Sequence, residues 1–92
     1  MEDNRTSDMY LASTLIAYGG EIEDVDKHDE RRQVFIFRSL PSFVWVINEE
    51  YVTKQVVKGI AEIKSLMIAG KLLFPPNFIT AIKSIKSYIY TE

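Results

Sequence analysis

Apolar residues near the N-terminus recur at every third or fourth position, which is the spacing of a helix with one buried face. These positions are Leu11, Leu15 and Tyr18. Asp8, like the two residues before it, is of a type that caps helix N-termini. Two glycines follow at positions 19 and 20, and glycine readily adopts the left-handed conformation that closes a helix. The pattern predicts a helix over residues 8–18.

The next two segments have the composition of β-strands. Residues 33–38 include four consecutive β-branched or aromatic side chains, Val34 to Phe37, which suit a sheet that is covered at least partly on both faces. Residues 21–26 form a weaker, acidic strand, and such charges at a sheet edge discourage pairing with other chains. We expect an antiparallel hairpin with a charged loop over residues 27–32.

The middle of the chain supports two interpretations. Residues 43–47 alone have the composition of a strand. A longer stripe, however, has spacings of 7, 4, 4, 3 and 4 residues, and it consists of Trp45, Val52, Val56, Ile60, Ile63 and Met67. Because these spacings are typical of a helix, we predict one long middle helix over residues 41–69, with Pro41 in its first turn and Gly70 after its end.

A last helix is expected over residues 77–90, because Pro75 and Pro76 prevent the previous helix from continuing. Its apolar face consists of Phe78, Ile82, Ile85 and Ile89. The prediction is therefore an α+β fold in one domain, residues 1–92, with an N-terminal helix, an antiparallel β-hairpin, a long middle helix and a C-terminal helix.

Several landmarks occur in a familiar order along these elements. They are Thr6-Ser7-Asp8, Leu11-Ala12, Leu15, Gly19, residues 32–37, Gly70-Lys71-Leu72, Phe78, Ala81, Lys86 and Ile89-Tyr90. With them the chain resembles an uncharacterised family of small domains from bacteriophages and mobile elements, whose members contain a helix, a hairpin, a middle helix and a terminal helix. The resemblance implies this fold and this biological setting, and it supplies no activity to carry over. Residues 39–69 form a longer middle segment than the family has.

The two parts of the chain carry opposite charge. Residues 1–30 have nine acidic side chains against Arg5 and Lys27, a net charge of −7, whereas residues 31–92 have nine basic against four acidic side chains, a net charge of +5. Such asymmetry is a sign of an acidic or basic contact surface. The candidate partner-binding residues in the acidic part are Asp24, Asp26, Asp29 and Glu30.

The residue types for catalysis are scarce. The chain of 92 residues has no cysteine and one histidine, His28, which lies in the charged loop. Residues 24–30 begin like a calcium-binding loop, but the sixth position is Asp29 instead of glycine and the twelfth is Phe35 instead of glutamate. We therefore expect no enzymatic activity, no cofactor and no metal site.

Nucleic-acid binding is the alternative function. Its candidate residues are Arg31, Arg32, Lys83 and Lys86. Phosphate binding usually draws on a dense basic patch, whereas this chain has an isoelectric point of about 5.4.

Binding to another protein has a stronger physical motive. The expected middle helix is apolar on more than one side, and so small a domain has few other elements to cover it. We predict a homodimer whose interface includes Trp45, Val52 and Val56, and a further protein partner, in host defence or replication if the chain is encoded by a phage. The longest uncharged run of the chain, the 12 residues 9–20, is well short of the ~20 residues of a membrane span, so we expect no membrane insertion. If the chain is encoded by a phage, we expect it in the cytoplasm of the bacterial host.

Overall fold

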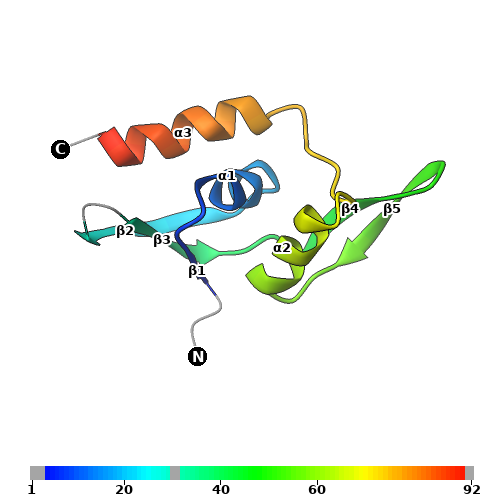
Figure 1. The fold of residues 1–92 in the computed structure, drawn as a ribbon, viewed down its shortest axis with the longest axis horizontal. Coiled ribbons are helices and arrows are strands. Elements are labelled where there is room, and N and C mark those ends of the chain that lie inside the picture. The colour runs from blue at the N-terminus through cyan, green and yellow to red at the C-terminus, as the bar shows by residue number, and fades with distance from the viewer. Residues whose placement is uncertain (1–3, 30–31, 91–92) are drawn as a thin grey trace.

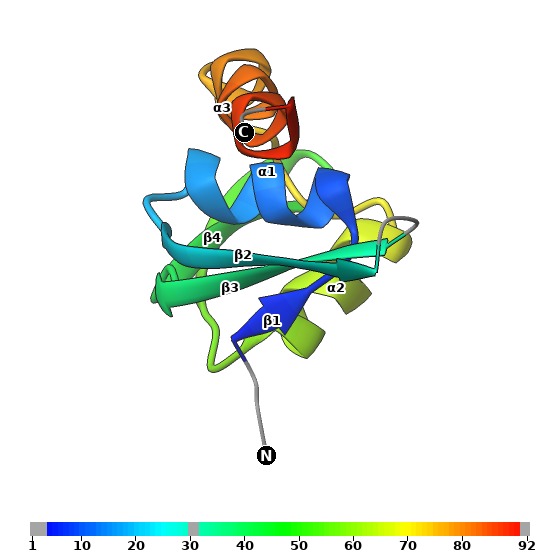
Figure 2. The ribbon, with the colours of Figure 1, turned by 90° about the vertical axis from the view of Figure 1, so that its left-hand side faces the viewer.

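Helix α1 (Met9–Ala17) lies in the middle of the molecule, with a three-stranded sheet on one side and helix α3 (Phe78–Tyr90) on the other (Figure 2). Its side chains are therefore buried on nearly all sides, including those of Ser13 and Thr14. The two hydroxyls donate hydrogen bonds to the carbonyls of Met9 (2.8 Å) and Tyr10 (2.9 Å) in the same helix. This internal pairing removes the cost of burying them.

The computed structural model describes residues 4–29 and 32–90 (Figure 1). Its elements in chain order are β1 (Arg5–Thr6), α1, β2 (Glu21–Asp29), β3 (Arg32–Ser39), β4 (Phe43–Asn48), β5 (Tyr51–Val56), α2 (Ile60–Ile68) and α3. All the strand pairs are antiparallel, in a sheet of order β1-β3-β2 and a separate β4-β5 hairpin. The predicted α+β class with antiparallel strands is confirmed.

The N-terminal helix begins and ends as its sequence predicts. The Asp8 side chain accepts hydrogen bonds from the backbone N–H groups of Tyr10 (2.9 Å) and Leu11 (3.2 Å), which have no partner within the helix. Gly19 has a φ of 103°, which favours glycine. Gly20 follows so close to the helix that an added Cβ atom would lie 2.8 Å from the carbonyl oxygen of Leu15.

The three-stranded sheet buries one face against α1. Phe35 and Phe37 of β3 are almost completely buried, and the residues that pair with them on β2 are Val25 and Ile22. The predicted hairpin of residues 21–26 and 33–38 is therefore confirmed, with the acidic strand β2 at an edge. The two strands are longer than expected, because they continue through most of the charged segment.

The prediction of a long middle helix over residues 41–69 is wrong. Its first part forms the antiparallel β4-β5 hairpin, and only the last part forms a helix, α2. Along β4 the burial alternates, since Val44 and Val46 are buried whereas Trp45 and Ile47 are exposed. This period of two residues is that of a strand with one covered face.

The apolar spacings in this segment suit a strand as well as a helix, which is why they predicted a helix wrongly. Four residues return to the same side of a helix and also to the same side of a strand, so the step from Val52 to Val56 does not distinguish them. The seven-residue step from Trp45 to Val52 crosses the tight turn between the strands, in which Glu49 has a positive φ of 51°. Cross-strand pairing then brings Trp45, Val52 and Val56 onto one face of the hairpin, whereas the rest of the stripe, Ile60, Ile63 and Met67, lies in α2.

Helix α2 and the connector after it cover the hairpin. Lys58 donates its backbone N–H to the Glu62 carboxylate (2.9 Å) just before α2, and the helix buries Ile60 and Ile63. The chain then returns along β4, where Lys71 and Leu73 form backbone hydrogen bonds with β4. Val44 and Val46 thereby join a single core that also includes α1 and β3.

Helix α3 is the outermost layer of the molecule. It packs on α1 (Figure 2). Ala81 and Ile85 of this helix are both buried. The predicted C-terminal helix over residues 77–90 is confirmed to within one residue.

Candidate functional site

One face of the β4-β5 hairpin carries most of the exposed apolar side chains of these two strands. Directly opposite residues of an antiparallel pair point to the same side of the sheet. The register pairs Phe43 with Val56, Trp45 with Lys54, and Ile47 with Val52. We call these six residues the outer hairpin face; the other face of the hairpin carries the buried Val44 and Val46.

The outer hairpin face is open to solvent. Relative exposure is 39% for Trp45, 45% for Val52 and 70% for Val56, the three residues that the sequence suggested as a dimer interface. The structure brings all three together, on a sheet face instead of the predicted helix. Ile47 lies beside them and is also exposed. Single exposed apolar residues are common, but a contiguous group is typical of an interaction surface.

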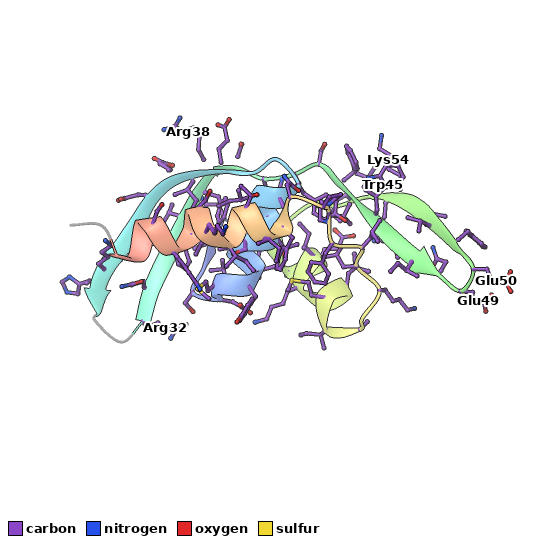
Figure 3. The ribbon with its side chains drawn as sticks, turned by 90° about the horizontal axis from the view of Figure 1, so that it is seen from above. Arg32, Arg38, Trp45, Glu49, Glu50 and Lys54 are labelled. Carbon is purple, nitrogen blue, oxygen red and sulfur yellow. The ribbon has the colours of Figure 1, made fainter. Side chains whose placement is uncertain are left out.

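The aromatic side chains on this face contact one another. The Phe43 and Trp45 rings lie edge to face, with centroids 5.9 Å apart and an angle of 82° between the ring planes. The Lys54 ammonium nitrogen lies 4.2 Å from the centroid of the Phe43 ring. Figure 3 shows Trp45 and Lys54 beside each other on the hairpin, with Glu49 and Glu50 at its tip. This cation–π contact holds the one charged group of the face against its apolar surface.

A cavity of about 330 Å³ adjoins the outer hairpin face at Trp45. Its lining residues are Ala17, Tyr18, Phe43, Trp45, Leu73, Pro75 and Pro76. The Tyr18 hydroxyl accepts a hydrogen bond from the Trp45 backbone N–H (3.2 Å) and donates one to the Leu73 carbonyl. Tyr18 therefore joins the end of α1 to β4 and to the connector that runs beside it.

Burial raises the pKa of Tyr18 above its usual value of 10.0, and the hydrogen bond from the Trp45 backbone partly opposes this shift. Because the folded chain holds this proton more tightly than the unfolded chain, Tyr18 stabilises the fold fully below about pH 10 and loses this contribution as the pH rises toward the folded pKa. We expect the free energy of unfolding to fall between about pH 8 and about pH 10.5, and to fall less in Tyr18→Phe. Urea unfolding at both pH values measures this difference.

Tyr10→Phe is the matched control for that prediction, since Tyr10 is on the same helix and exposed to solvent. Its unfolding free energy should depend on pH as that of the wild type does. If both variants changed the pH dependence of the unfolding free energy equally, the effect could not be assigned to the burial of Tyr18.

The candidate acidic residues lie on a different surface. Asp24 and Asp26 are exposed on the face of the three-stranded sheet opposite to Phe35 and Phe37. Their carboxylates accept hydrogen bonds from the backbone N–H groups of Val25 (2.8 Å) and His28 (2.9 Å), near irregularities in the β2-β3 register. These bonds give both carboxylates a structural role within β2. Of the other two candidates, Asp29 lies at the end of β2, and Glu30 falls outside the described residues.

The candidate basic residues are divided between two layers. Arg32 begins β3 and donates from Nε to the Ser7 hydroxyl (3.1 Å), whereas Lys83 and Lys86 are exposed on α3. Helix α1 lies between these two layers (Figure 2). Arg31 falls outside the described residues. The described basic candidates therefore do not form one continuous patch.

Among residues 4–29 and 32–90, no group of three or more His, Cys, Asp or Glu side chains is placed to hold a metal ion. His28 is exposed in β2. None of the helices in the described part of the chain is long and apolar enough to cross a membrane.

Several residues of the candidate site were not identified from the sequence. Tyr18, Leu73 and Pro75 reach Trp45 from other parts of the chain, and nothing in the local pattern indicates these contacts. Ile47 follows from the strand interpretation of residues 43–47, because every second residue of a strand points to the same side, which places Ile47 with Phe43 and Trp45.

Comparisons of this chain with protein-family models, with curated proteins and with solved structures gave no match.

Proposed function

We propose that this protein is a non-enzymatic interaction module that binds a protein partner through the outer hairpin face and acts as a homodimer. The observation that carries the proposal is the exposure of Trp45, Ile47, Val52 and Val56 together on one sheet face. Burying this face in a complex removes apolar surface from water, which is the main favourable contribution to most protein association.

The composition of the face supports a protein partner. Tryptophan is enriched among the residues that dominate binding energies at protein interfaces. Trp45 lies in the middle of the outer hairpin face and also lines the cavity that Tyr18 lines. Lys54 gives the face one positive charge beside Phe43, which favours a partner that presents a carboxylate next to an apolar group. The resemblance to phage and mobile-element domains suggests that the partner belongs to the defence or replication machinery of the host.

Replacing Ile47 with aspartate tests the proposal. Ile47 is 38% exposed, so Ile47→Asp places a charge on the outer hairpin face without burying it in the core. We expect the dissociation constant for the partner to rise at least about tenfold, which corresponds to about 1.4 kcal/mol. The partner is first captured from host extract with wild-type protein, and the affinity is then measured with the purified partner.

Ile79→Asp is the matched control. Ile79 is 62% exposed on α3 and is not part of the outer hairpin face, so this variant should bind as the wild type does. Trp45 is the chain's single tryptophan, so its emission should also shift to shorter wavelength when the partner covers it. Equal binding by Ile47→Asp and wild type, with no change in emission on adding the partner, would exclude this face as the binding site.

A further inference from the structure

One edge of the β4-β5 hairpin is already covered by the chain. The Ile47 N–H donates to the Lys71 carbonyl (2.7 Å), and the Trp45 carbonyl accepts from the Leu73 N–H (2.9 Å). The backbone groups of these two β4 residues therefore point away from β5 and bond to the connector. Only the far edge, along β5, can extend the sheet.

The backbone groups on the free edge of β5 follow from the same register. Val52 is opposite Ile47 and Lys54 is opposite Trp45. Because Ile47 and Trp45 bond to the connector, these are non-hydrogen-bonded pairs of the antiparallel ladder. In such pairs the N–H and C=O groups of both residues point away from the partner strand. The N–H and C=O groups of Val52 and Lys54 therefore point outward, where no strand among the described residues pairs with β5.

The β5 edge lacks the features that protect other edges. In the three-stranded sheet, β1 is only two residues long, and β2 is acidic and interrupted by register shifts. Short length, charge and irregular register all hinder pairing with another strand. By contrast, β5 pairs with β4 without a shift over six residues, and the charge of Lys54 is held over the Phe43 ring.

We propose that the free edge of β5 pairs antiparallel with β5 of a second copy of this chain, which joins two hairpins into one four-stranded sheet. This inference rests on the proposed function, because it identifies the second copy as one of the protein partners. It uses the backbone edge of β5, whereas the further partner binds the side chains of the outer hairpin face. Pairing places the outer faces of the two copies side by side as one larger apolar surface.

Charge determines the register of this pairing. A two-fold axis at Lys54 would place the two Lys54 side chains directly opposite, and like charges there are unfavourable. An axis at Thr53 places Thr53 opposite Thr53 and Val52 opposite Lys54 of the second copy. Threonine pairs are favourable across strands. An axis at Val52 would pair only residues 51–53 of the two β5 strands, whereas an axis at Thr53 pairs residues 51–55. The two-fold axis therefore passes between the two Thr53 residues.

The same register brings opposite charges together at both ends. Glu50 lies in the tight turn at the tip of the hairpin (Figure 3), whereas Lys54 and Lys58 lie toward its base. With the axis at Thr53, Glu50 of each copy is diagonal to Lys54 and Lys58 of the other. Diagonal neighbours across strands are within reach of long side chains. A parallel arrangement would instead place like charges beside each other.

A single cysteine tests both the pairing and its register, because the native chain has none. Thr53→Cys places two cysteines at a non-hydrogen-bonded pair, about 4.5 Å apart at Cα and within disulfide range. Gln55→Cys is the control on the same strand face, with its two cysteines roughly 14 Å apart in this register. We expect Thr53→Cys to form a covalent dimer rapidly under mild oxidation and Gln55→Cys to form little. Equal cross-linking of both variants, or of neither, would overturn the proposal.

Light scattering and a proline variant extend the test. The wild type should have about twice the chain mass of 10.6 kDa at micromolar concentration. Val52→Pro removes an outward N–H without breaking a bond to β4, so it should be monomeric with unchanged circular dichroism. Ile47→Asp on β4 should remain dimeric and still lose the further partner. If Val52→Pro were folded and dimeric, edge pairing would be contradicted. Loss of partner binding by Ile47→Asp, with the dimer intact, tests only the proposed role of the outer hairpin face.

Discussion

Val44→Asp is expected to destabilise the protein more than any of the other substitutions proposed as tests. Val44 is completely buried on the inner face of β4, within the core that α1, β3 and α2 share. An aspartate there is either a buried charge without a partner or a protonated carboxyl without hydrogen bonds, and either costs about 4 kcal/mol or more. Because small domains have a total stability of about 5–15 kcal/mol, circular dichroism should show a large loss of structure or a melting temperature lower by at least about 15 °C.

Ile47→Asp provides the matched comparison on the same strand. Ile47 points to the outer hairpin face, so its replacement should cost no more than about 1 kcal/mol and leave the spectrum native. The two variants should differ because burial alternates from residue to residue along β4, so that Val44 faces the core and Ile47 faces solvent. A similar loss of stability in both variants would contradict the β4-β5 hairpin.

Ile85→Ala is expected to lower the free energy of unfolding by about 2–5 kcal/mol. Ile85 is completely buried where α3 packs on α1. Removing its side-chain atoms loses apolar burial and leaves a cavity that two packed helices cannot fully close. In chemical denaturation the midpoint should decrease with little change in the slope, since the same surface is exposed on unfolding.

Ile79→Ala is the control for this helix. It makes the same chemical change at a position of α3 that is exposed to solvent, so its effect should remain within about 0.5 kcal/mol of the wild type. An equally small effect for Ile85→Ala would mean that α3 contributes little to the core.

The β4-β5 hairpin connects stability with proposed function. Its inner face supplies Val44 and Val46 to the core, and its outer face presents Trp45, Ile47 and Val56 to solvent. The core thus fixes the inner residues, whereas the outer residues can change with little effect on stability. Variants of the outer face therefore separate binding from folding.

Local patterns in the sequence determined the parts of the fold that have local signals. Asp8 and Gly19 mark the two ends of α1 through a cap and a positive φ, and both act within a few residues along the chain. The β-branched and aromatic run in β3 and the 3.6-residue pattern of α3 likewise indicated their own elements. The apolar character of Trp45, Val52 and Val56 was also evident, and it suggested a binding surface on the wrong element.

Only the tertiary structure decided between strand and helix for residues 43–56. Spacings of four residues fit both the helical and the strand period. The choice depends on whether Val44 and Val46 can pack into a core, and that core is formed with α1 and β3 from earlier in the chain and with α2 directly after the hairpin. The same holds for the cavity at Trp45, which needs Tyr18 from α1 and Leu73 from the connector. Local composition set the preference of each segment, and packing between segments selected the β4-β5 hairpin because it buries one face and exposes the other.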